Sequence, residues 1–299
     1  GCIHTVFQLE PGGCVVNPDV GREYLLEDPL PLTENPCRVL VAGAGPAGLA
    51  AARMLTLRGH RVTLCEAKGQ TGGALGLAAK APGRDELGDV LKYFMEELER
   101  LKVDLRLSTP LDEILLQAVS PDEVVLATGS LPDMPLLKGL FQTGMQLCTA
   151  VEILEEKAVA GKRVIVWGGN QAGLILADHL AGQDREVTVL NRRGHFAEDM
   201  SANDRFYLRE RLKRQQVTLI KEVKVQTFLK DGVRFRTAGR SHTLEGFDTV
   251  VLADTFVSLR DCANPAKQLG LRVHFIGDAK QPRHLMYAIS EAEELGRSL

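Results

Sequence analysis

Short apolar runs alternate along the chain with longer segments of helical character. Residues 38–42 form one such run, an alanine-rich helical segment follows, and a second run ends at Glu66. The same order recurs from 163–167 to 186–190. Continuous apolar runs of this length are typical of strands buried on both faces of a parallel sheet. The pattern therefore predicts an α/β protein with mostly parallel sheets.

A glycine-rich turn joins strand to helix in each of these two units. The first turn has the spacing G-x-G-x-x-G, with Gly43, Gly45 and Gly48 at the three glycine positions. The second keeps the outer glycines but has Asn170 at the middle position. The interval from the first glycine to the end of the following strand is the same in both units. The repeated βαβ unit predicts two Rossmann-like dinucleotide-binding lobes.

Each glycine of the first turn has its own role. The first permits the tight turn, the second lets the backbone approach a pyrophosphate, and the third allows the helix to pack closely on the strand. The helix N-terminus offers free N–H groups and partial positive charge, which suit phosphate. The acid that ends the second strand is placed to accept hydrogen bonds from adenosine ribose hydroxyls. The predicted cofactor-binding residues here are Gly43, Gly45, Pro46, Ala47, Gly48 and Glu66.

Further short segments belong to the same predicted site. Gly73 lies in a glycine-rich loop after the second strand, and Ala127-Thr128-Gly129 forms a small-residue turn after another strand. Near the C-terminus, Gly277 and Asp278 precede a loop and a helix that begins near Leu285. A carboxylate before a helix can bind the ribityl chain of a flavin, so we expect Asp278 to contact FAD. Alternatively, Asp278 caps its own helix, and the two roles can coexist.

The second turn, which begins at Gly168, departs from the fingerprint at two positions. Asn170 places a side chain where it would crowd a pyrophosphate, although asparagine tolerates unusual backbone angles better than most residues. Asn191 replaces the ribose-binding acid and is followed by Arg192 and Arg193. Guanidinium groups suit a 2′-phosphate, so NADPH is expected over NADH if either binds. Alternatively, the arginines are ordinary surface residues, and dinucleotide binding there is weak or lost.

The remaining pattern sets the domain boundaries. Residues 1–37 lack a clear period and end in an acidic, proline-rich linker. We predict that 38–150 and 254–299 form the first lobe, with 151–253 as a second lobe inserted within it. The strand within 273–279 is expected to return to the first lobe. The second lobe is expected to contain a basic, solvent-facing helix at 205–215 and a meander over 217–221, 224–229 and 233–237.

Composition and charge narrow the class of protein. The 299 residues suffice for two lobes, and 44% hydrophobic with 25% charged residues is typical of globular proteins. A formal net charge of −3 gives no reason to expect nucleic acid or an acidic membrane as partner. No apolar run approaches the roughly 20 residues that span a bilayer. Because the six cysteines contain no C-x-x-C pair, we expect a reducing, cytoplasmic location.

Two cysteines near the start of the chain are candidate metal ligands. Cys2 and Cys14 need two further ligands, and the alternative is that both are free thiols. The chain begins with Gly1 rather than methionine, so we expect it to be a piece of a longer polypeptide.

No catalytic residue is predicted, because hydride transfer to a flavin depends on positioning rather than on acid–base side chains.

These motifs together resemble one family. They are Cys2, Cys14 with Asn17-Pro18, the first glycine turn, Gly72-Gly73, Ala127-Thr128-Gly129, and Ile276-Gly277-Asp278-Ala279 with Pro282-Arg283. Over essentially its whole length the chain resembles the C-terminal half of the iron–sulfur NADH:flavin oxidoreductases, which include 2,4-dienoyl-CoA reductase and trimethylamine dehydrogenase. The resemblance implies an N-terminal (β/α)₈ barrel, absent here, that holds FMN and the substrate.

The resemblance also implies a [4Fe–4S] cluster between the barrel and the lobes. The family's last two cluster cysteines are separated by eleven residues and followed by x-x-Asn-Pro, which Cys2 and Cys14 reproduce. The first two cluster cysteines would lie upstream. Since a cluster is not expected to survive on two of four ligands, we expect the isolated chain to lack iron.

Family members differ in what the lobes hold. In the dienoyl-CoA reductase type, FAD on the first lobe takes hydride from NADPH on the second and passes electrons through the cluster to FMN. In the trimethylamine dehydrogenase type, ADP replaces FAD, and electrons leave through an external electron-transfer flavoprotein. Glu66 and Asp278 favour FAD. Asn170, Ala253-Asp254-Thr255 and Pro282-Arg283 favour the second type.

We therefore predict the electron-transfer half of an iron–sulfur flavoenzyme, with FAD, or ADP in its place, on the first lobe and NAD(P)H on the second. The expected partners are the missing FMN barrel, an external electron-transfer flavoprotein and, in the full-length protein, further copies of the same chain. One alternative is a nucleotide-binding scaffold of an amine dehydrogenase or N-demethylase. Another, of a different class, is a non-catalytic dinucleotide-binding module. Residues of the missing barrel would determine whether the substrate is an enoyl thioester or a methylated amine.

Overall fold

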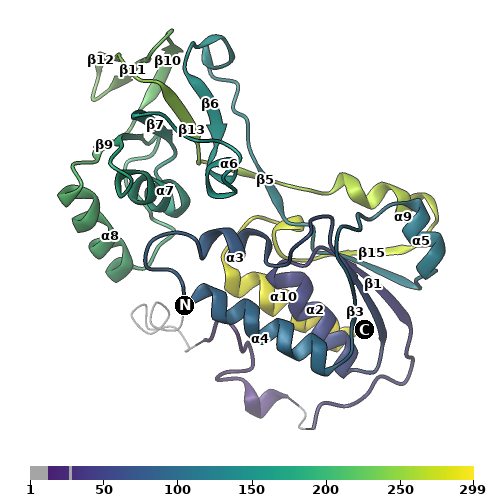
Figure 1. Cartoon of the computed structure of the whole chain (residues 1–299). Helices are drawn as coiled ribbons and strands as arrows, with labels where there is room; N and C mark the ends of the chain where they lie inside the picture. Colours follow the sequence, from purple (N-terminus) through teal and green to yellow (C-terminus); the bar gives the residue numbers. More distant parts are fainter. Residues whose placement is uncertain (1–12, 27–28) are drawn as a thin grey trace. The chain divides into compact units, whose positions relative to one another are not determined.

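The computed structural model describes residues 13–26 and 29–299, which divide into two compact units (Figure 1). Unit 1 comprises the residues up to Ala79, Arg84–Leu131 and Val257–Leu299, and unit 2 comprises Lys80–Gly83 and Pro132–Phe256. The predicted boundary, which placed 132–150 and 254–256 in the first lobe, is therefore wrong. Residues 132–150 contain β6 (Gln146–Thr149), which pairs in parallel with β13 (Thr249–Leu252) of unit 2. The sequence pattern marked only the glycine turn, and β6 precedes it.

The sheet of unit 1 has five parallel strands in the order β15-β4-β1-β2-β3. Their bounds are β1 Arg38–Ala42, β2 Arg61–Cys65, β3 Asp104–Arg106, β4 Glu123–Leu126 and β15 Arg272–Phe275. β15 pairs with β4, so the prediction that the last strand returns to this unit is confirmed. Parallel strands end at the same edge of a sheet. The carboxyl ends of β1, β2, β4 and β15 therefore bring Gly43, Glu66, Ala127 and Gly277 to one edge.

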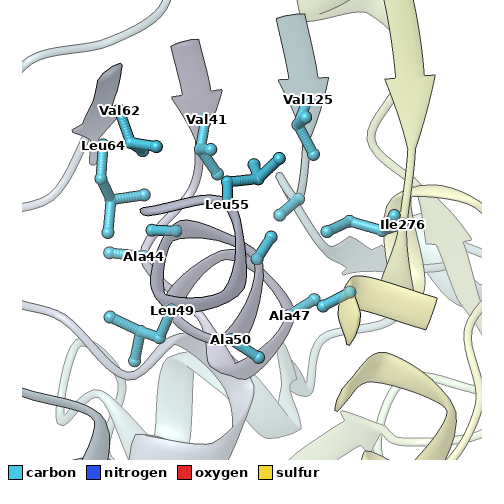
Figure 2. Close-up of a cluster of buried hydrophobic side chains, with 14 of the residues drawn as sticks. Val41, Ala44, Ala47, Leu49, Ala50, Leu55, Val62, Leu64, Val125 and Ile276 are labelled. Atoms are coloured by element: carbon cyan, nitrogen blue, oxygen red, sulfur yellow. The ribbon is translucent and has the colours of Figure 1, made fainter. Parts of the chain in front are cut away.

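Helices cover both faces of this sheet. On one face α2 (Pro46–Leu57) packs against both α4 (Leu87–Arg100) and α10 (Leu285–Ser298). On the other face lie α5 (Glu113–Val119) and α9 (Asn264–Gln268), and α3 (Gly73–Ala78) follows the glycine-rich loop. Figure 2 shows apolar side chains of β1, β2 and β4 meeting those of α2. Ala50, Ala51 and Ala52 are fully buried, because their small side chains let neighbouring elements approach α2 closely.

The sheet of unit 2 has five parallel strands in the order β6-β13-β7-β8-β9. The strands not yet given are β7 Arg163–Trp167, β8 Glu186–Leu190 and β9 Thr218–Ile220. On one face pack α6 (Ala150–Leu154), α7 (Gln171–Ala181) and α8 (Ala202–Arg214). On the other face lies an antiparallel meander of β10 (Lys224–Phe228), β11 (Val233–Thr237) and β12 (Arg240–Leu244). The two Rossmann-like lobes of the prediction are thus confirmed.

The predicted meander was right for 224–229 and 233–237, which contain β10 and β11, but it was wrong in its first strand and omitted the last one. Residues 218–220 form β9, which pairs in parallel with β8 at the edge of the main sheet rather than with β10. The third strand of the meander is β12, which pairs with β11 through a turn containing Ala238 and Gly239. β12 is largely polar because most of its residues are exposed, so it gave no apolar signal.

The remaining elements are short. They are the 3-10 helices η1 Glu23–Leu25, η2 Leu140–Gln142, η3 Asp261–Ala263 and η4 Gly277–Ala279, and the paired strands β5 Ser130–Pro132 and β14 Phe256–Ser258. Within the described ranges, no helix combines the length and apolar character that crossing a membrane requires.

Candidate dinucleotide-binding sites

The first glycine turn has the backbone geometry that the fingerprint predicts. Gly43 has a φ of +104°, and a Cβ atom there would lie 2.4 Å from the carbonyl oxygen of Ala127. A Cβ atom on Gly48 would lie 1.8 Å from the carbonyl oxygen of Gly43. A side chain at Gly43 would therefore push the turn away from the residues that follow β4, and a side chain at Gly48 would push α2 away from the turn.

The N-terminus of α2 is open. Gly45 is its N-cap residue, in an extended conformation, and it has no side chain to accept a hydrogen bond from the first helical turn. The nearest atom to a Cβ built on Gly45 is the Cα of Gly73, at 4.0 Å. Among the described residues, no side chain bonds the N–H groups of Ala47 or Gly48. These groups are free to donate to an anion, and the helix dipole adds partial positive charge there.

The glycine-rich loop after β2 lies against the same turn. The N–H of Gly72 donates to the carbonyl oxygen of Ala44 at 2.8 Å. A Cβ on Gly73 would lie 3.2 Å from the Cα of Gly45, and Gly73 has a φ of +50°. The absence of side chains at Gly45 and Gly73 thus keeps two backbone segments within reach of one ligand.

Glu66 follows β2 and contacts the turn directly. Its Oε2 accepts a hydrogen bond from the N–H of Ala44 at 2.8 Å, and its Oε1 accepts one from the N–H of Lys68 at 2.9 Å. Each carboxylate oxygen has a second lone pair that can still accept a ribose hydroxyl. Glu66 therefore holds the turn in shape and remains able to bind a sugar.

The segments after β4 and β15 meet at the same edge of the sheet. Thr128 Oγ1 donates to the carbonyl oxygen of Leu259 at 2.6 Å, and Gly129 has a φ of +77° with open space around it. Asp278 Oδ2 accepts from Ser130 Oγ at 3.1 Å, and its Oδ1 accepts from the N–H of Arg283 at 3.1 Å. The carboxylate is thus fixed by two partners and keeps lone pairs for a ligand hydroxyl.

Asp278 does not cap the long C-terminal helix. It lies within η4, whereas α10 begins at Leu285 with His284 as its N-cap residue. The alternative role suggested for Asp278 is therefore wrong for α10. Gly277 has a φ of +58°, and a Cβ there would lie 2.8 Å from that of Ala47. The first turn of α2 and the segment after β15 are consequently in close contact.

The second turn repeats the backbone of the first. Gly168 has a φ of +139°, and a Cβ there would lie 2.5 Å from the carbonyl carbon of Ala253. A Cβ on Gly173 would lie 2.0 Å from the carbonyl oxygen of Gly168. The backbone of both turns thus meets the requirement of the fingerprint, and the difference between them lies in side chains.

Asn170 caps α7. Its φ of −79° is ordinary, so the tolerance of asparagine for unusual backbone angles is not used here. Its Oδ1 accepts from the N–H of Gly173 at 2.9 Å, and its Nδ2 donates to the carbonyl oxygen of Asp254 at 2.6 Å. Asp199 Oδ1 accepts from the N–H of Gln171 at 2.8 Å. Two N–H groups that would meet a phosphate are therefore bonded to side chains of unit 2 itself.

The residues expected to hold the second ribose are also engaged. Asn191 is 1% exposed; its Nδ2 donates to the carbonyl oxygen of His195 at 2.7 Å, and its Oδ1 accepts from the N–H of Arg193 at 3.1 Å. Arg192 forms an ion pair with Asp254 at 2.8 Å, and Arg193 is exposed. Asn191 is thus a buried structural residue, and Arg192 must leave Asp254 to reach a 2′-phosphate.

Sequence reasoning missed Asp199 and Asp254. Asp199 lies in the segment between β8 and α8, far along the chain from the turn that it contacts, and no motif spacing marks it. The sequence marks Asp254 only within Ala253-Asp254-Thr255, a segment that favours the trimethylamine dehydrogenase type. Its carbonyl oxygen and its carboxylate fix Asn170 and Arg192, respectively.

Of the two candidate metal ligands, Cys2 lies outside the described residues. Cys14 is a free, half-buried thiol whose Sγ accepts a hydrogen bond from the N–H of Val16 at 3.4 Å. The described residues contain no group of three or more side chains suited to a metal ion. A Cβ on Gly13 would lie 3.6 Å from the Cε of Met286, so the segment carrying Cys14 lies beside the first turn of α10.

Comparison with known proteins relates this geometry to redox enzymes. The sequence profile described as pyridine nucleotide-disulphide oxidoreductase matches residues 37–274. A metal reductase of Desulforamulus reducens is 32% identical over 325 residues, covering 98% of this chain and 48% of that protein. The N,N-dimethylglycine/sarcosine dehydrogenase of Chromohalobacter salexigens is 38% identical over 200 residues, covering 63% of this chain and 28% of that protein.

A solved structure of 2-naphthoyl-CoA reductase in complex with 2-naphthoyl-CoA is similar in fold. It superposes with a TM-score of 0.92 at 30% identity, covering 100% of this chain and 45% of that one. These similarities confirm the resemblance drawn from the motifs. The chain spans about half the length of the metal reductase and the naphthoyl-CoA reductase, and less of the dehydrogenase.

Proposed function

Because this chain belongs to the pyridine nucleotide-disulphide oxidoreductase family, we propose that unit 1 binds FAD, or ADP in its place, as the electron-transfer part of a flavin-dependent oxidoreductase. The observation that carries the proposal is the open N-terminus of α2 beside Glu66. Gly45 leaves the helix uncapped, and Glu66 lies at the end of the neighbouring strand. This pair of features suits the pyrophosphate and the ribose of one adenine dinucleotide.

The residues of unit 1 divide the work of binding. The N–H groups of Ala47 and Gly48 would neutralise the pyrophosphate, and Glu66 would orient the adenosine ribose. Asp278, held by Ser130 and the N–H of Arg283, would accept a ribityl hydroxyl if the ligand is FAD. FAD, when bound, supplies the hydride- and electron-accepting chemistry, and the chain supplies position and charge.

The reductase type of this function has two further parts. Unit 2 would bind NAD(P)H as the hydride source, and electrons would pass through a [4Fe–4S] cluster to FMN in the N-terminal barrel of the same polypeptide. The resemblance to the dienoyl-CoA reductase type supports this, and the Cys14 segment lies beside α10 of unit 1. A four-thiolate cluster needs more ligands than Cys2 and Cys14, so upstream residues would complete it.

One observation favours a second function, in which unit 1 holds ADP as a scaffold for an amine-oxidising barrel. Asn170 and Asp199 already occupy the N–H groups of the second turn, which disfavours a dinucleotide in unit 2. The similarity to an N,N-dimethylglycine/sarcosine dehydrogenase supports this function. Electrons would then leave through an external electron-transfer flavoprotein.

Identifying the retained ligand tests the proposal. The purified chain is incubated with excess FAD or ADP and freed of unbound nucleotide. It is then gently denatured, and the released nucleotide is identified by mass. For the reductase type, we expect FAD with an absorbance at about 450 nm that bleaches with NADPH. ADP in a colourless chain is expected for the scaffold. Retention of neither nucleotide by a folded chain would contradict both.

A further inference from the structure

The segment between β8 and α8 folds over the second glycine turn. The N–H of Ala197 donates to the carbonyl oxygen of Gly169 at 2.7 Å, and Asp199 Oδ1 accepts from the N–H of Gln171 at 2.8 Å. Asn191, at the start of this segment, packs so closely that a Cβ on Gly169 would lie 2.3 Å from its Cγ. The segment of residues 191–201, here called the capping segment, is thus held to the turn at three points.

Asp199 is the charged member of this contact. Its carboxylate sits on the first N–H of α7, the position where a helix N-terminus attracts an anion most strongly. In unit 1 the corresponding position of α2 is a proline, and among the described residues no carboxylate bonds its first turn. A pyrophosphate approaching α7 would meet both a blocked donor and a like charge.

The conformation of the capping segment is itself unfavourable. Ala197 is 1% exposed and has a φ of +47°, in the left-handed region that alanine rarely adopts. The hydrogen bonds at Gly169 and Gln171 hold this residue in place. Such a strained residue persists only where its surroundings fix it, and its release would favour an open segment.

We propose that Asp199 is an internal competitor for the pyrophosphate of a nicotinamide dinucleotide in unit 2, so that the capping segment determines whether this unit binds one. The proposal rests on the proposed function, since it concerns the nicotinamide site of that enzyme. Asn170 bonds α7 as an ordinary cap and stays with the helix. Asp199 belongs to a separate segment and can leave. The same segment carries Arg192, whose ion pair with Asp254 also breaks when the 2′-phosphate of NADPH takes the guanidinium.

The single tryptophan provides a direct readout. Trp167 is the only tryptophan of the chain and the last residue of β7, immediately before Gly168. Its fluorescence should be quenched by energy transfer to a reduced nicotinamide bound in unit 2. Titration with NADPH and with NADH, with inorganic pyrophosphate as competitor, measures binding without depending on turnover.

The test compares Asp199→Ala, Asp199→Asn and Glu245→Ala with the unchanged chain. Glu245 is an exposed acid of unit 2 outside the capping segment, so its removal changes the net charge equally and leaves that segment intact. Asp199→Ala is expected to bind NADPH at least tenfold more tightly, Asp199→Asn to an intermediate degree, and Glu245→Ala as the unchanged chain. Pyrophosphate should compete in the Asp199 variants.

Two outcomes would overturn the proposal. One is that both Asp199 variants, with native circular dichroism and melting, bind NADPH no more tightly than the unchanged chain. The other is that they bind it more weakly, which would make Asp199 a ligand-positioning residue instead. FAD or ADP retained by unit 1 is measured separately by mass, so failure of the proposed function and failure of this inference are distinguishable.

Discussion

At the residue scale, one position separates the two glycine turns. Gly45 and Asn170 are both N-cap residues with extended backbones, and their flanking glycines make the same close contacts. The side chain of Asn170 bonds the N–H of Gly173, whereas Gly45 leaves α2 uncapped. The sequence predicted that Asn170 would crowd a pyrophosphate. The structure adds a stronger reason, because the asparagine satisfies the N–H group that the pyrophosphate needs.

Placing asparagine in the first turn should therefore transfer this property to unit 1. The extended backbone of Gly45 is compatible with any side chain. A Cβ atom added there would have the Cα of Gly73, at 4.0 Å, as its nearest neighbour. Gly45→Asn should weaken ADP or FAD binding at least tenfold, measured by calorimetry. The free energy of unfolding should change by less than about 1 kcal/mol, the usual effect of such a cap.

Gly45→Ala is the matched control, because it adds a Cβ without a hydrogen-bonding group. Equal losses of affinity for Gly45→Ala and Gly45→Asn would assign the effect to crowding rather than capping. Unchanged affinity in both would contradict the placement of the pyrophosphate at α2.

The residues of the candidate site were predictable to different degrees. The glycines and Glu66 follow from local spacing, since the turn, helix and second strand are contiguous in sequence. Asp199 and Asp254 were not predictable, because their contacts with the second turn depend on the path of separate segments. Motif spacing identifies residues that are close together in the sequence. It does not identify charged residues that only the tertiary structure brings to the site.

At the element scale, α10 contacts the segment that follows Cys14 within unit 1. Arg297 of α10 forms an ion pair with Asp19 at 2.9 Å, and Glu293, one turn earlier, is 6% exposed. Burial raises the pKa of Glu293 to about 7, against the opposing effect of Arg53 at 3.7 Å. Asp19 raises the same pKa and Arg297 lowers it. The contact between α10 and the segment after Cys14 therefore contains a carboxyl that titrates near neutrality.

The raised pKa of Glu293 predicts that the free energy of unfolding depends on pH. Its pKa rises from 4.5 to about 7 on folding, so the folded chain keeps a proton that the unfolded chain loses in this window. The free energy of unfolding should consequently fall as pH rises between these values, by at most about 3 kcal/mol. Glu293→Gln should remove this component, measured by urea unfolding at a series of pH values. Glu294→Gln, at the exposed neighbour, should retain it, and an equal slope in Glu293→Gln would refute the assignment.

Elements were predicted well where apolar runs were long and poorly where strands lay at an edge. β1, β4, β7 and β13 are buried on both faces, and each was visible as a continuous apolar run. β9 and β12 are edge strands with mostly exposed or half-buried residues, so the sequence misassigned one and missed the other. Pairing partners are set by tertiary contacts, which short polar strands do not encode locally.

At the scale of the whole molecule, each unit has its own sheet and its own cores. The clusters of buried apolar side chains around α2 and around α5 belong to unit 1. The corresponding clusters around α7 and beneath the meander belong to unit 2. The nested order was predictable because the last strand follows a second lobe that is already complete. The boundary at Pro132 was not, since β6 precedes every recognised motif of unit 2.

Hydrogen exchange can locate the adenine nucleotide within this arrangement. Saturating ADP should slow exchange of backbone amides in Gly43–Leu49 and in Glu66–Gly73, because these segments form the turn and the loop beside it. At a concentration about 100 times its dissociation constant, bound ADP stabilises its site by about 2.7 kcal/mol. The amides of Gly168–Leu174, capped by Asn170 and Asp199, should exchange as before and serve as the internal control. Protection of this second turn instead, with none at the first, would move the primary nucleotide site to unit 2 and contradict the role of α2.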